Sequence, residues 1–215
     1  MTDPAAIASR LRTFYGLQPR PPADLFEAIV WDIVSRDALP ARRDLAWRAL
    51  QRLPALTPDA AFRVKPKELQ AALALAGPHA EQRLERMRGA AGEIRRQRDL
   101  FAAVASGEAR LRASLRALAR VPGLDRAGRH RALLFGVGRC LLPADAGLER
   151  VLTRLGLAPR RAFARRLPPD LDAWRDAALY LEHHARHTCL PVGPHCNVCR
   201  LAEGCPEALR QKPEA

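Results

Sequence analysis

The sequence is poor in several residue types, and each shortage narrows the classes of protein to which it can belong. Aromatic residues make up only 5% of the 215 residues, and β-branched residues are few, whereas alanine and leucine dominate. Because alanine and leucine favour helices while β-branched and aromatic residues favour strands, the composition predicts an all-α protein. Hydrophobic residues make up 48%, as is ordinary for a globular chain that buries a core.

Long apolar runs are absent as well. No stretch reaches the ~18 consecutive apolar residues of a membrane span, and residues 1–16 lack the apolar core of a secretory signal. We therefore expect no membrane partner and a cytoplasmic location. In that reducing compartment, clustered cysteines indicate metal ligands rather than disulfides.

Lysine is almost missing from a strongly basic chain. Only three of the 36 basic residues are lysines, at Lys65, Lys67 and Lys212, and the formal net charge is +13. A GC-rich genome would explain the use of arginine in place of lysine, but it would not explain the excess of positive charge. That excess favours a polyanionic partner, with nucleic acid as the first candidate.

Helical periodicity runs through most of the chain, and we find no convincing strand and no internal repeat. Helices are expected at residues 5–15, 25–35, 41–53, 67–76, 80–105 (one long or two shorter), 111–120, from there to about 138, near 147–155, and at 170–187. Asp24 is a suitable N-cap for the second of these helices. Val121-Pro122-Gly123 predicts a tight turn before the helix that ends near residue 138.

Four of the five cysteines lie together near the end of the chain. They follow the pattern C-x6-C-x2-C-x5-C at Cys189, Cys196, Cys199 and Cys205. Thiolates are soft ligands for iron–sulfur clusters and for zinc. A four-cysteine zinc site is usually built from two C-x2–4-C knuckles, whereas only one such pair exists here, so the spacing favours a [4Fe–4S] cluster over zinc. Cys140 follows an apolar helix and is expected to be a buried packing residue.

This cysteine pattern at the end of an all-α chain resembles the cluster loop of the endonuclease III family, within the helix-hairpin-helix DNA glycosylases. Arg186-His187-Thr188-Cys189 is similar to the R-Y-T-C sequence of that family. The resemblance implies two helical lobes with a DNA groove between them. One is a six-helix barrel at 24–139 with the hairpin at about 111–138, and the other is an iron–sulfur domain formed by 1–23 and 140–215.

The resemblance also implies a partner and a place in the cell. The partner would be double-stranded DNA with a damaged base that is flipped out of the duplex. The protein would act as a monomer in the cytoplasm, with the chromosomal DNA.

The segment Val121-Pro122-Gly123-Leu124-Asp125 resembles the family hairpin L-P-G-x-G-x-K-T-A. A short hairpin leaves backbone N–H groups unpaired at the start of its second helix, and these donors bind a phosphate without recognising base sequence. The segment taken alone is also consistent with an ordinary connection between two helices. The residues expected to contact DNA here are Pro122, Gly123, Leu124, Arg126, Gly128 and Arg129.

Two hairpin positions depart from the family pattern. Asp125 replaces the second glycine, where its carboxylate would oppose a phosphate, although it is also able to cap the second helix. Ala127 replaces the lysine that attacks the sugar as a Schiff-base nucleophile in the family, and alanine has no amine for that reaction. The loss of this amine argues against lyase activity.

Two aspartates are candidate catalytic residues. The segment from Ala144 to Val151 resembles the family sequence V-D-T-H-V-x-R-V, with Asp145 at the catalytic aspartate and Gly147 in place of histidine. Asp145 would activate water or stabilise an oxocarbenium-like sugar, and it is equally suited to be an N-cap. Asp32 interrupts an apolar helix; if buried, it is a candidate general acid, and the alternative is a half-exposed position.

Two further segments resemble the loops with which the family displaces a base. Ser35-Arg36-Asp37-Ala38 occupies the place of S-A-Q-A-T, with Asp37, or Arg36, where the family glutamine fills the hole left by the flipped base. The turn Ala76-Gly77-Pro78-His79 resembles the second loop, and Leu75 or His79 is the candidate wedge.

Three functions remain open. The first is a monofunctional DNA N-glycosylase of base excision repair, a hydrolase that uses water instead of lysine. The second is a non-catalytic binder of damaged or distorted DNA, and the third, least favoured, is a bifunctional glycosylase and AP lyase with a displaced lysine. Asp145 favours the first, whereas Asp125, Ala127, Gly147 and Asp37 favour the second; we take the first as the leading hypothesis.

Overall fold

The structure is a computed structural model, and it describes residues 3–210. These residues form helices and connecting segments and contain no strand, which confirms the all-α prediction. The chain divides into two compact units. Pro21–Arg139 form one, named here the hairpin unit, and the segments on either side of it together form the other, the cysteine unit.

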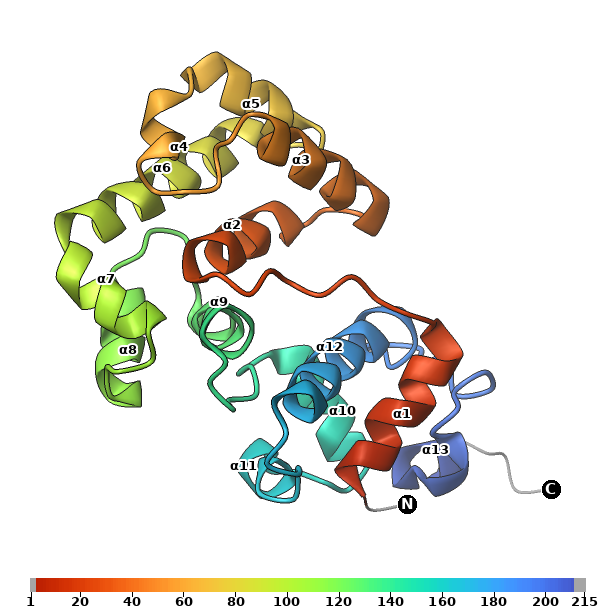
Figure 1. The fold of residues 1–215 in the computed structure, drawn as a ribbon. Helices are drawn as coiled ribbons and strands as arrows, with labels where there is room; N and C mark the ends of the chain where they lie inside the picture. Colours follow the sequence, from red (N-terminus) through yellow and green to blue (C-terminus); the bar gives the residue numbers. More distant parts are fainter. Residues whose placement is uncertain (1–2, 211–215) are drawn as a thin grey trace. The chain divides into compact units, whose positions relative to one another are not determined.

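The hairpin unit is built around one buried helix. Its helices are α2 (Leu25–Ser35), α3 (Pro40–Arg52), α4 (Ala60–Arg63), α5 (Pro66–Ala74), α6 (Ala80–Arg96), α7 (Arg98–Ala105), α8 (Leu111–Leu118), α9 (Arg126–Arg131) and the π-helical segment η1 (Ala132–Val137). Helix α2 contacts α3, α6, α9 and η1, so every residue from Ala28 to Val34 is buried (Figure 1). Asp24 caps α2 by accepting the Glu27 N–H at 3.0 Å, as predicted.

Two details of this unit lie beyond a periodic sequence pattern. The region predicted as one long or two shorter helices is two helices, which meet at Gln97. The chain predicted to be helical up to residue 138 widens into η1 after α9 and ends at Gly138, whose φ is 79°. Close packing of η1 on the start of α2 requires a glycine, because a Cβ on Gly136 would lie 2.7 Å from the Asp24 carbonyl oxygen.

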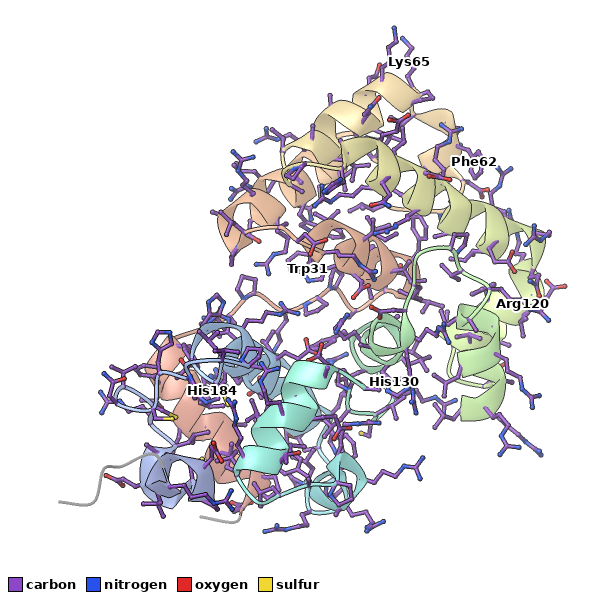
Figure 2. All side chains as sticks on the ribbon, turned by 180° about the vertical axis from the view of Figure 1, so that it is seen from behind. Trp31, Phe62, Lys65, Arg120, His130 and His184 are labelled. Atoms are coloured by element: carbon purple, nitrogen blue, oxygen red, sulfur yellow. The ribbon has the colours of Figure 1, made fainter. Side chains whose placement is uncertain are left out.

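Three aromatic side chains of this unit, Trp31, Trp47 and Phe62, contact another ring or an arginine. Trp31, labelled in Figure 2, meets Trp47 edge to face with the ring centroids 5.1 Å apart. The Arg43 guanidinium lies 4.6 Å from the Trp31 ring. Phe62 lies within 5.0 Å of the Arg88 guanidinium and 4.7 Å of the Arg95 guanidinium. Each such cation–π contact is worth about 0.5–1 kcal/mol at an exposed site.

The cysteine unit is organised on its longest helix, α12. Its elements are α1 (Pro4–Tyr15), α10 (Ala146–Arg154), α11 (Arg160–Ala164), α12 (Leu171–His187), η2 (Ala202–Gly204) and α13 (Pro206–Arg210). Both α1 and α10 pack against α12 (Figure 1). The segment that follows α1 is attached to α12 through polar contacts. Tyr180 donates to the Gly16 carbonyl at 3.1 Å, and Arg20 pairs with Asp176 at 2.6 Å.

Cys140 corrects one prediction. Its side chain is exposed, not buried, because the chain leaves helical structure at Gly138 and Cys140 follows in an irregular segment. None of the helices within residues 3–210 combines the length and the apolar character of a membrane-spanning segment.

Candidate functional site

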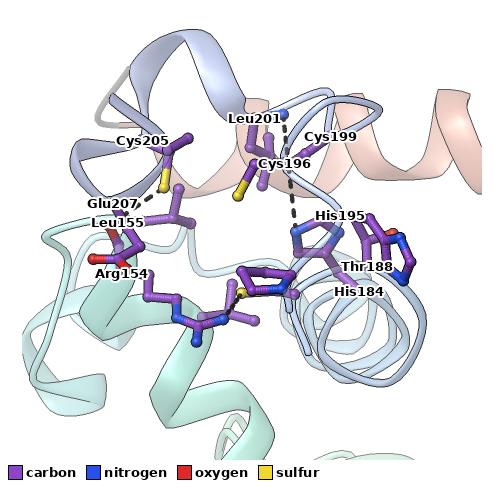
Figure 3. Close-up of a pocket in the computed structure, with 14 residues that line it drawn as sticks. Arg154, Leu155, His184, Thr188, His195, Cys196, Cys199, Leu201, Cys205 and Glu207 are labelled. Carbon is purple, nitrogen blue, oxygen red and sulfur yellow. Dashed lines mark hydrogen bonds between the residues drawn. The ribbon is translucent and has the colours of Figure 1, made fainter. Parts of the chain in front are cut away.

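The four clustered cysteines line one pocket in the cysteine unit. None of these four described cysteines is part of a disulfide, and they share the pocket with His184, Thr188, Arg154 and Leu201, among others. Figure 3 shows the side chains of His184, Arg154, Cys196, Cys199 and Cys205 around this common space. The structure thus brings together the residues that their spacing predicted to act as one set.

Helix α10 holds the chain that leaves α12 and carries the first cysteine. Arg150 donates to the Cys189 carbonyl at 3.0 Å and to the Ala185 carbonyl at 2.9 Å. Arg154, one turn further along α10, donates to the Leu190 carbonyl at 2.6 Å and to the Pro191 carbonyl at 3.0 Å. Sequence analysis gave neither arginine a role. Arg150 stands at the arginine of the family sequence V-D-T-H-V-x-R-V, which is the signal that could have identified it, whereas nothing in the sequence distinguishes Arg154 from the many other arginines.

N–H donors also point at the cysteine sulfurs. Arg154 donates to Cys189 Sγ at 3.3 Å, and the Leu201 N–H donates to Cys199 Sγ, also at 3.3 Å. Burial raises the pKa of the Cys196 and Cys199 thiols, and the neighbouring cysteines add to the effect. A bound metal would reverse this shift, because its charge deprotonates a coordinating thiol.

The arrangement of the donors bears on what they would hold. Among the described residues, no three His, Cys, Asp or Glu side chains converge on a point suited to a single metal ion. A structural zinc needs its four ligands about 2.0–2.3 Å from one centre, whereas each iron of a [4Fe–4S] cluster takes its own thiolate and the sulfurs stand further apart. Four cysteine side chains around one pocket, with N–H groups aimed at two of the sulfurs, are a donor set that suits a thiolate-bound iron–sulfur cluster.

A buried imidazole lies against the same cysteines. Nε2 of His184 is 3.7 Å from Cys199 Sγ, and Nδ1 is 2.7 Å from the Tyr15 hydroxyl. The Tyr15 hydroxyl is also 2.5 Å from Thr188 Oγ1. Burial, with a smaller contribution from His183, lowers the pKa of His184 to about 4, while burial raises the pKa of Tyr15. The imidazole is therefore neutral near pH 7.

Asp145 stands at the start of α10, in the cysteine unit. Its Oδ1 accepts the Leu148 N–H at 3.0 Å, so the predicted N-cap is present. A Cβ on Gly147 would lie 2.8 Å from Ala185 Cβ and 2.9 Å from Asp145 Oδ1. Glycine at this position, where the family has histidine, is therefore explained by the close approach of α10 to α12. The catalytic role of Asp145 stays a prediction.

The predicted hairpin is present in the other unit, between α8 and α9. The Leu124 N–H donates to the Val121 carbonyl at 3.3 Å, and Gly123 has a φ of 75°. The positive φ of Gly123 favours glycine, and a Cβ there would lie 2.6 Å from the Arg86 side chain, which would have to move. Arg129 donates to the Leu124 carbonyl at 3.2 Å and braces the turn.

Asp125 caps the second helix of the hairpin. Its Oδ1 accepts the Gly128 N–H at 2.7 Å, and its Oδ2 lies 3.4 Å from the Arg36 guanidinium. The predicted capping role is thus confirmed. The Gly128 N–H, a backbone donor of the kind that the hairpin was expected to offer to a phosphate, is instead bonded to the Asp125 carboxylate. Ala127 is buried beside it, whereas Arg126 is exposed.

Asp32 is buried, so the half-exposed alternative is wrong. Only 5% of its side chain is accessible, and its oxygens lie 2.8 Å from Arg131 Nε and 3.4 Å from the Arg36 guanidinium. A Cβ on Gly128 would lie 2.7 Å from Asp32 Oδ2, which explains glycine at that hairpin position. The carboxylate ties α2 to α9; whether it also acts in catalysis stays a prediction.

A single arginine holds the two segments that resemble base-displacing loops. Arg83 is buried and donates to the Arg36 carbonyl at 2.8 Å, to the Gly77 carbonyl at 3.3 Å and to the Pro78 carbonyl. Asp37 and His79 come directly after Arg36 and Pro78, whose carbonyls Arg83 binds. Both residues are exposed, and their φ values are 57° and 70°. Left-handed backbone at a non-glycine residue persists only where its surroundings hold it. Sequence analysis missed Arg83.

Exposed leucines accompany both loops. Leu75, a predicted wedge candidate, is 43% exposed. Leu39, which sequence analysis missed, is 70% exposed and lies directly before Pro40, the first residue of α3. An exposed leucine in a polar segment just before a proline is the signal that could have identified it.

This arrangement of helices is similar to that of several solved structures, whereas sequence comparisons find no match. No protein-family profile and no curated protein matches the sequence. A thermostable thymine-DNA glycosylase aligns at a TM-score of 0.70 with 16% identity, over 96% of this chain and 97% of its own. Endonuclease III in a non-covalent DNA complex aligns at 0.70 with 17% identity, over 96% and 95%.

A more distant match widens the comparison. The 3-methyladenine DNA glycosylase of H. pylori, bound to 1,N6-ethenoadenine, aligns at a TM-score of 0.64 with 13% identity, over 85% of this chain and 96% of its own. At identities this low, the TM-scores establish the fold alone. This chain has the fold of the helix-hairpin-helix DNA glycosylases.

Proposed function

We propose that the protein is a base excision DNA repair protein of the endonuclease III type and acts as a monofunctional DNA N-glycosylase on a damaged base in duplex DNA. One observation carries the proposal: in a glycosylase fold, the Asp145 carboxylate is fixed at the start of α10 while position 127 is a buried alanine. A carboxylate without an amine supports hydrolysis and not imine chemistry.

Asp145 would act on the sugar. As the bond between the sugar and the base breaks, its electron pair leaves with the base and positive charge develops on the sugar, which a carboxylate stabilises. Water then adds to the anomeric carbon, and Asp145 accepts the proton that this water loses. The hydrogen bond from the Leu148 N–H keeps Oδ1 oriented, so that the carboxylate does not rotate freely.

Cys189, Cys196, Cys199 and Cys205 would hold a [4Fe–4S] cluster. When bound, the group cross-links the C-terminal loop and supplies a redox-active centre. Arg150 and Arg154 hold the loop at its backbone carbonyls, and Arg154 also contributes a charge-assisted hydrogen bond to the Cys189 sulfur.

The hairpin unit supplies the proposed contacts to DNA. The exposed turn residues Pro122 and Gly123 and the exposed Arg126 would contact phosphate, consistent with a net charge of +13. The loops that carry Arg36, Asp37 and His79 would meet the distorted base pair, with Leu39 and Leu75 as the apolar side chains available to fill the gap.

A non-catalytic binder of damaged DNA is the second candidate. Two features of the hairpin favour it. Asp125 accepts the Gly128 N–H that would otherwise be available to a phosphate, and a buried alanine, Ala127, stands where the family pattern has lysine. A bifunctional lyase would need a lysine from elsewhere; Lys65 is 82% exposed and lies 3.8 Å from Glu68.

An assay on a panel of oxidised, alkylated, deaminated and abasic duplexes tests the proposal. We expect strand breaks only after alkali, which cleaves the abasic product, and no borohydride-trapped adduct. Asp145→Asn should lower the rate by at least about 100-fold and leave DNA affinity unchanged, because asparagine still caps α10. A trapped adduct would favour the lyase, and binding without cleavage on every duplex would favour the non-catalytic binder.

A further inference from the structure

A continuous line of polar atoms runs from Thr188, at the end of α12, through Tyr15 of the N-terminal helix to one cysteine of the pocket. It begins at Thr188 Oγ1, 2.5 Å from the Tyr15 hydroxyl, and continues over 2.7 Å to His184 Nδ1. The far side of the ring, Nε2, lies 3.7 Å from Cys199 Sγ. Tyr15 is the last residue of α1, and 169 positions separate it from His184 in the sequence.

The hydrogen bonds along this line can be donated in only two directions, either from Cys199 toward Thr188 or from Thr188 toward Cys199. A neutral imidazole has one N–H, so one ring nitrogen donates while the other accepts. If Cys199 were a thiol, it would donate to Nε2, and Nδ1–H would donate to Tyr15. If Cys199 carries no proton, as a metal-bound thiolate does not, the only complete arrangement is the reverse one. Thr188 then donates to Tyr15, Tyr15 donates to Nδ1, and Nε2–H donates to Cys199.

The surroundings of the ring favour the second arrangement once the cysteines are occupied. His184 is 3% exposed, so water does not compete for its nitrogens. Cys199 already accepts the Leu201 N–H at 3.3 Å, and an imidazole N–H would be a second donor on the same sulfur. The ring centroids of His183 and His187 lie 4.2 Å apart, and the His183 ring also meets the Tyr15 ring edge to face at 4.6 Å, but neither histidine lines the pocket.

We propose that His184, held in one tautomer by Tyr15, is a positioning residue that donates its Nε2–H to the Cys199 sulfur of the bound cluster. The inference rests on the cluster proposed above. A donor at this sulfur stabilises the added negative charge of the reduced cluster, so it raises the reduction potential. It also orients the ligand, and removal of such a partner typically weakens metal retention by about 10–100-fold. Through Tyr15, the N-terminal helix becomes part of the environment of the cluster.

Four variants of the full-length protein, prepared anaerobically, separate the roles. His184→Phe keeps a ring of similar bulk but removes the donor. Tyr15→Phe removes only the hydroxyl that selects the tautomer. His184→Gln restores an N–H donor. His187→Phe is the matched control, because it makes the same change at an exposed position of the same helix.

The measurements are iron content, the reduction potential by protein-film voltammetry, and the rate of iron loss to a chelator. We expect the potential to shift to more negative values in His184→Phe, to shift less in Tyr15→Phe, to recover partly in His184→Gln, and to stay unchanged in His187→Phe. Iron loss should be about 10-fold faster in His184→Phe. If that variant fails to assemble a cluster, the shift in Tyr15→Phe alone decides the question.

Two results would overturn the inference in distinguishable ways. Wild-type protein that contains zinc or no metal would overturn the proposed cluster and this inference with it. Wild-type protein with its full iron content, but with one potential shared by Tyr15→Phe, His184→Phe and the control, would leave the cluster standing and overturn the role of His184 alone.

Discussion

The two units differ in how they use the residues that carry the resemblance. In the cysteine unit these residues face a common pocket or a helix start: four thiols line one space, and Asp145 caps α10. In the hairpin unit they are engaged with other parts of the protein, since Asp125 contacts Gly128 and Arg36, and the position of the family lysine is a buried alanine. The cysteine unit thus presents a set of potential ligand side chains to one common space, whereas Asp125 in the hairpin unit is engaged in contacts within the protein.

The largest expected effect tests whether the cysteine unit depends on its ligand set. Cys199→Ser should remove most of the iron, from about four per chain, together with the absorption near 400 nm. Cys140→Ser is the matched control, because Cys140 is exposed and does not line the pocket. Iron content and absorbance measure both. Equal iron in the two variants would contradict the assignment of Cys199 as a ligand.

The next effect compares a buried ion pair in the hairpin unit with an exposed one in the cysteine unit. Asp32→Ala leaves Arg131 and Arg36 without their shared carboxylate and should lower the free energy of unfolding by about 3–5 kcal/mol. Asp172→Ala removes a 2.8 Å pair with Arg20, but the aspartate is 63% exposed, so the loss should stay below about 1 kcal/mol. Urea unfolding measures the free energy of unfolding of both variants. If Asp32→Ala lost as little stability as Asp172→Ala, the stability of α2 would not depend on Asp32.

The third effect asks whether the altered hairpin still contacts DNA. Arg126→Glu should weaken binding to all duplexes alike by about 10-fold or more and reduce the slope of log affinity against log salt by about one. Arg210→Glu, on α13, changes the net charge by the same amount at an exposed position outside the hairpin. Fluorescence anisotropy across a salt series distinguishes them. If both variants lose affinity equally, only the overall charge of the chain matters.

The smallest effect concerns the carboxylate in the hairpin. Asp125→Asn keeps a side-chain oxygen for the Gly128 N–H but removes the charge that opposes a phosphate. We expect DNA affinity to rise about two- to fivefold at low salt, as befits a charge effect of about 0.5–1 kcal/mol at a helix start. The same anisotropy titration measures it. A fall in affinity, with thermal stability unchanged, would mean that Asp125 helps DNA binding.

Much of the framework could be predicted from sequence because it depends on neighbouring residues. The bounds of α2 and its Asp24 cap follow from a local pattern, and the spacing of the cysteines was enough to predict one shared site. Pairing over distance could not be predicted in this way. Arg131 lies 99 positions from Asp32, and no local feature marks it as the partner.

The errors and omissions have physical causes of the same kind. Cys140 follows an apolar segment and so suggested burial, but the π-helical segment ends the helix before it and leaves the side chain outside. The four-residue helix α4 is too short for a periodic signal. Arg83 is one arginine among many in the sequence, and only its three backbone acceptors in the structure distinguish it.

The position of Arg83 has a mechanical consequence. One guanidinium joined to the Arg36, Gly77 and Pro78 carbonyls makes two separate loops a single body, so neither is able to shift without straining the other. If these loops enter a duplex, they must do so in one concerted step. Substitutions at Asp37 and at His79 should then be non-additive in a double-mutant cycle, and they should become independent once Arg83 is replaced.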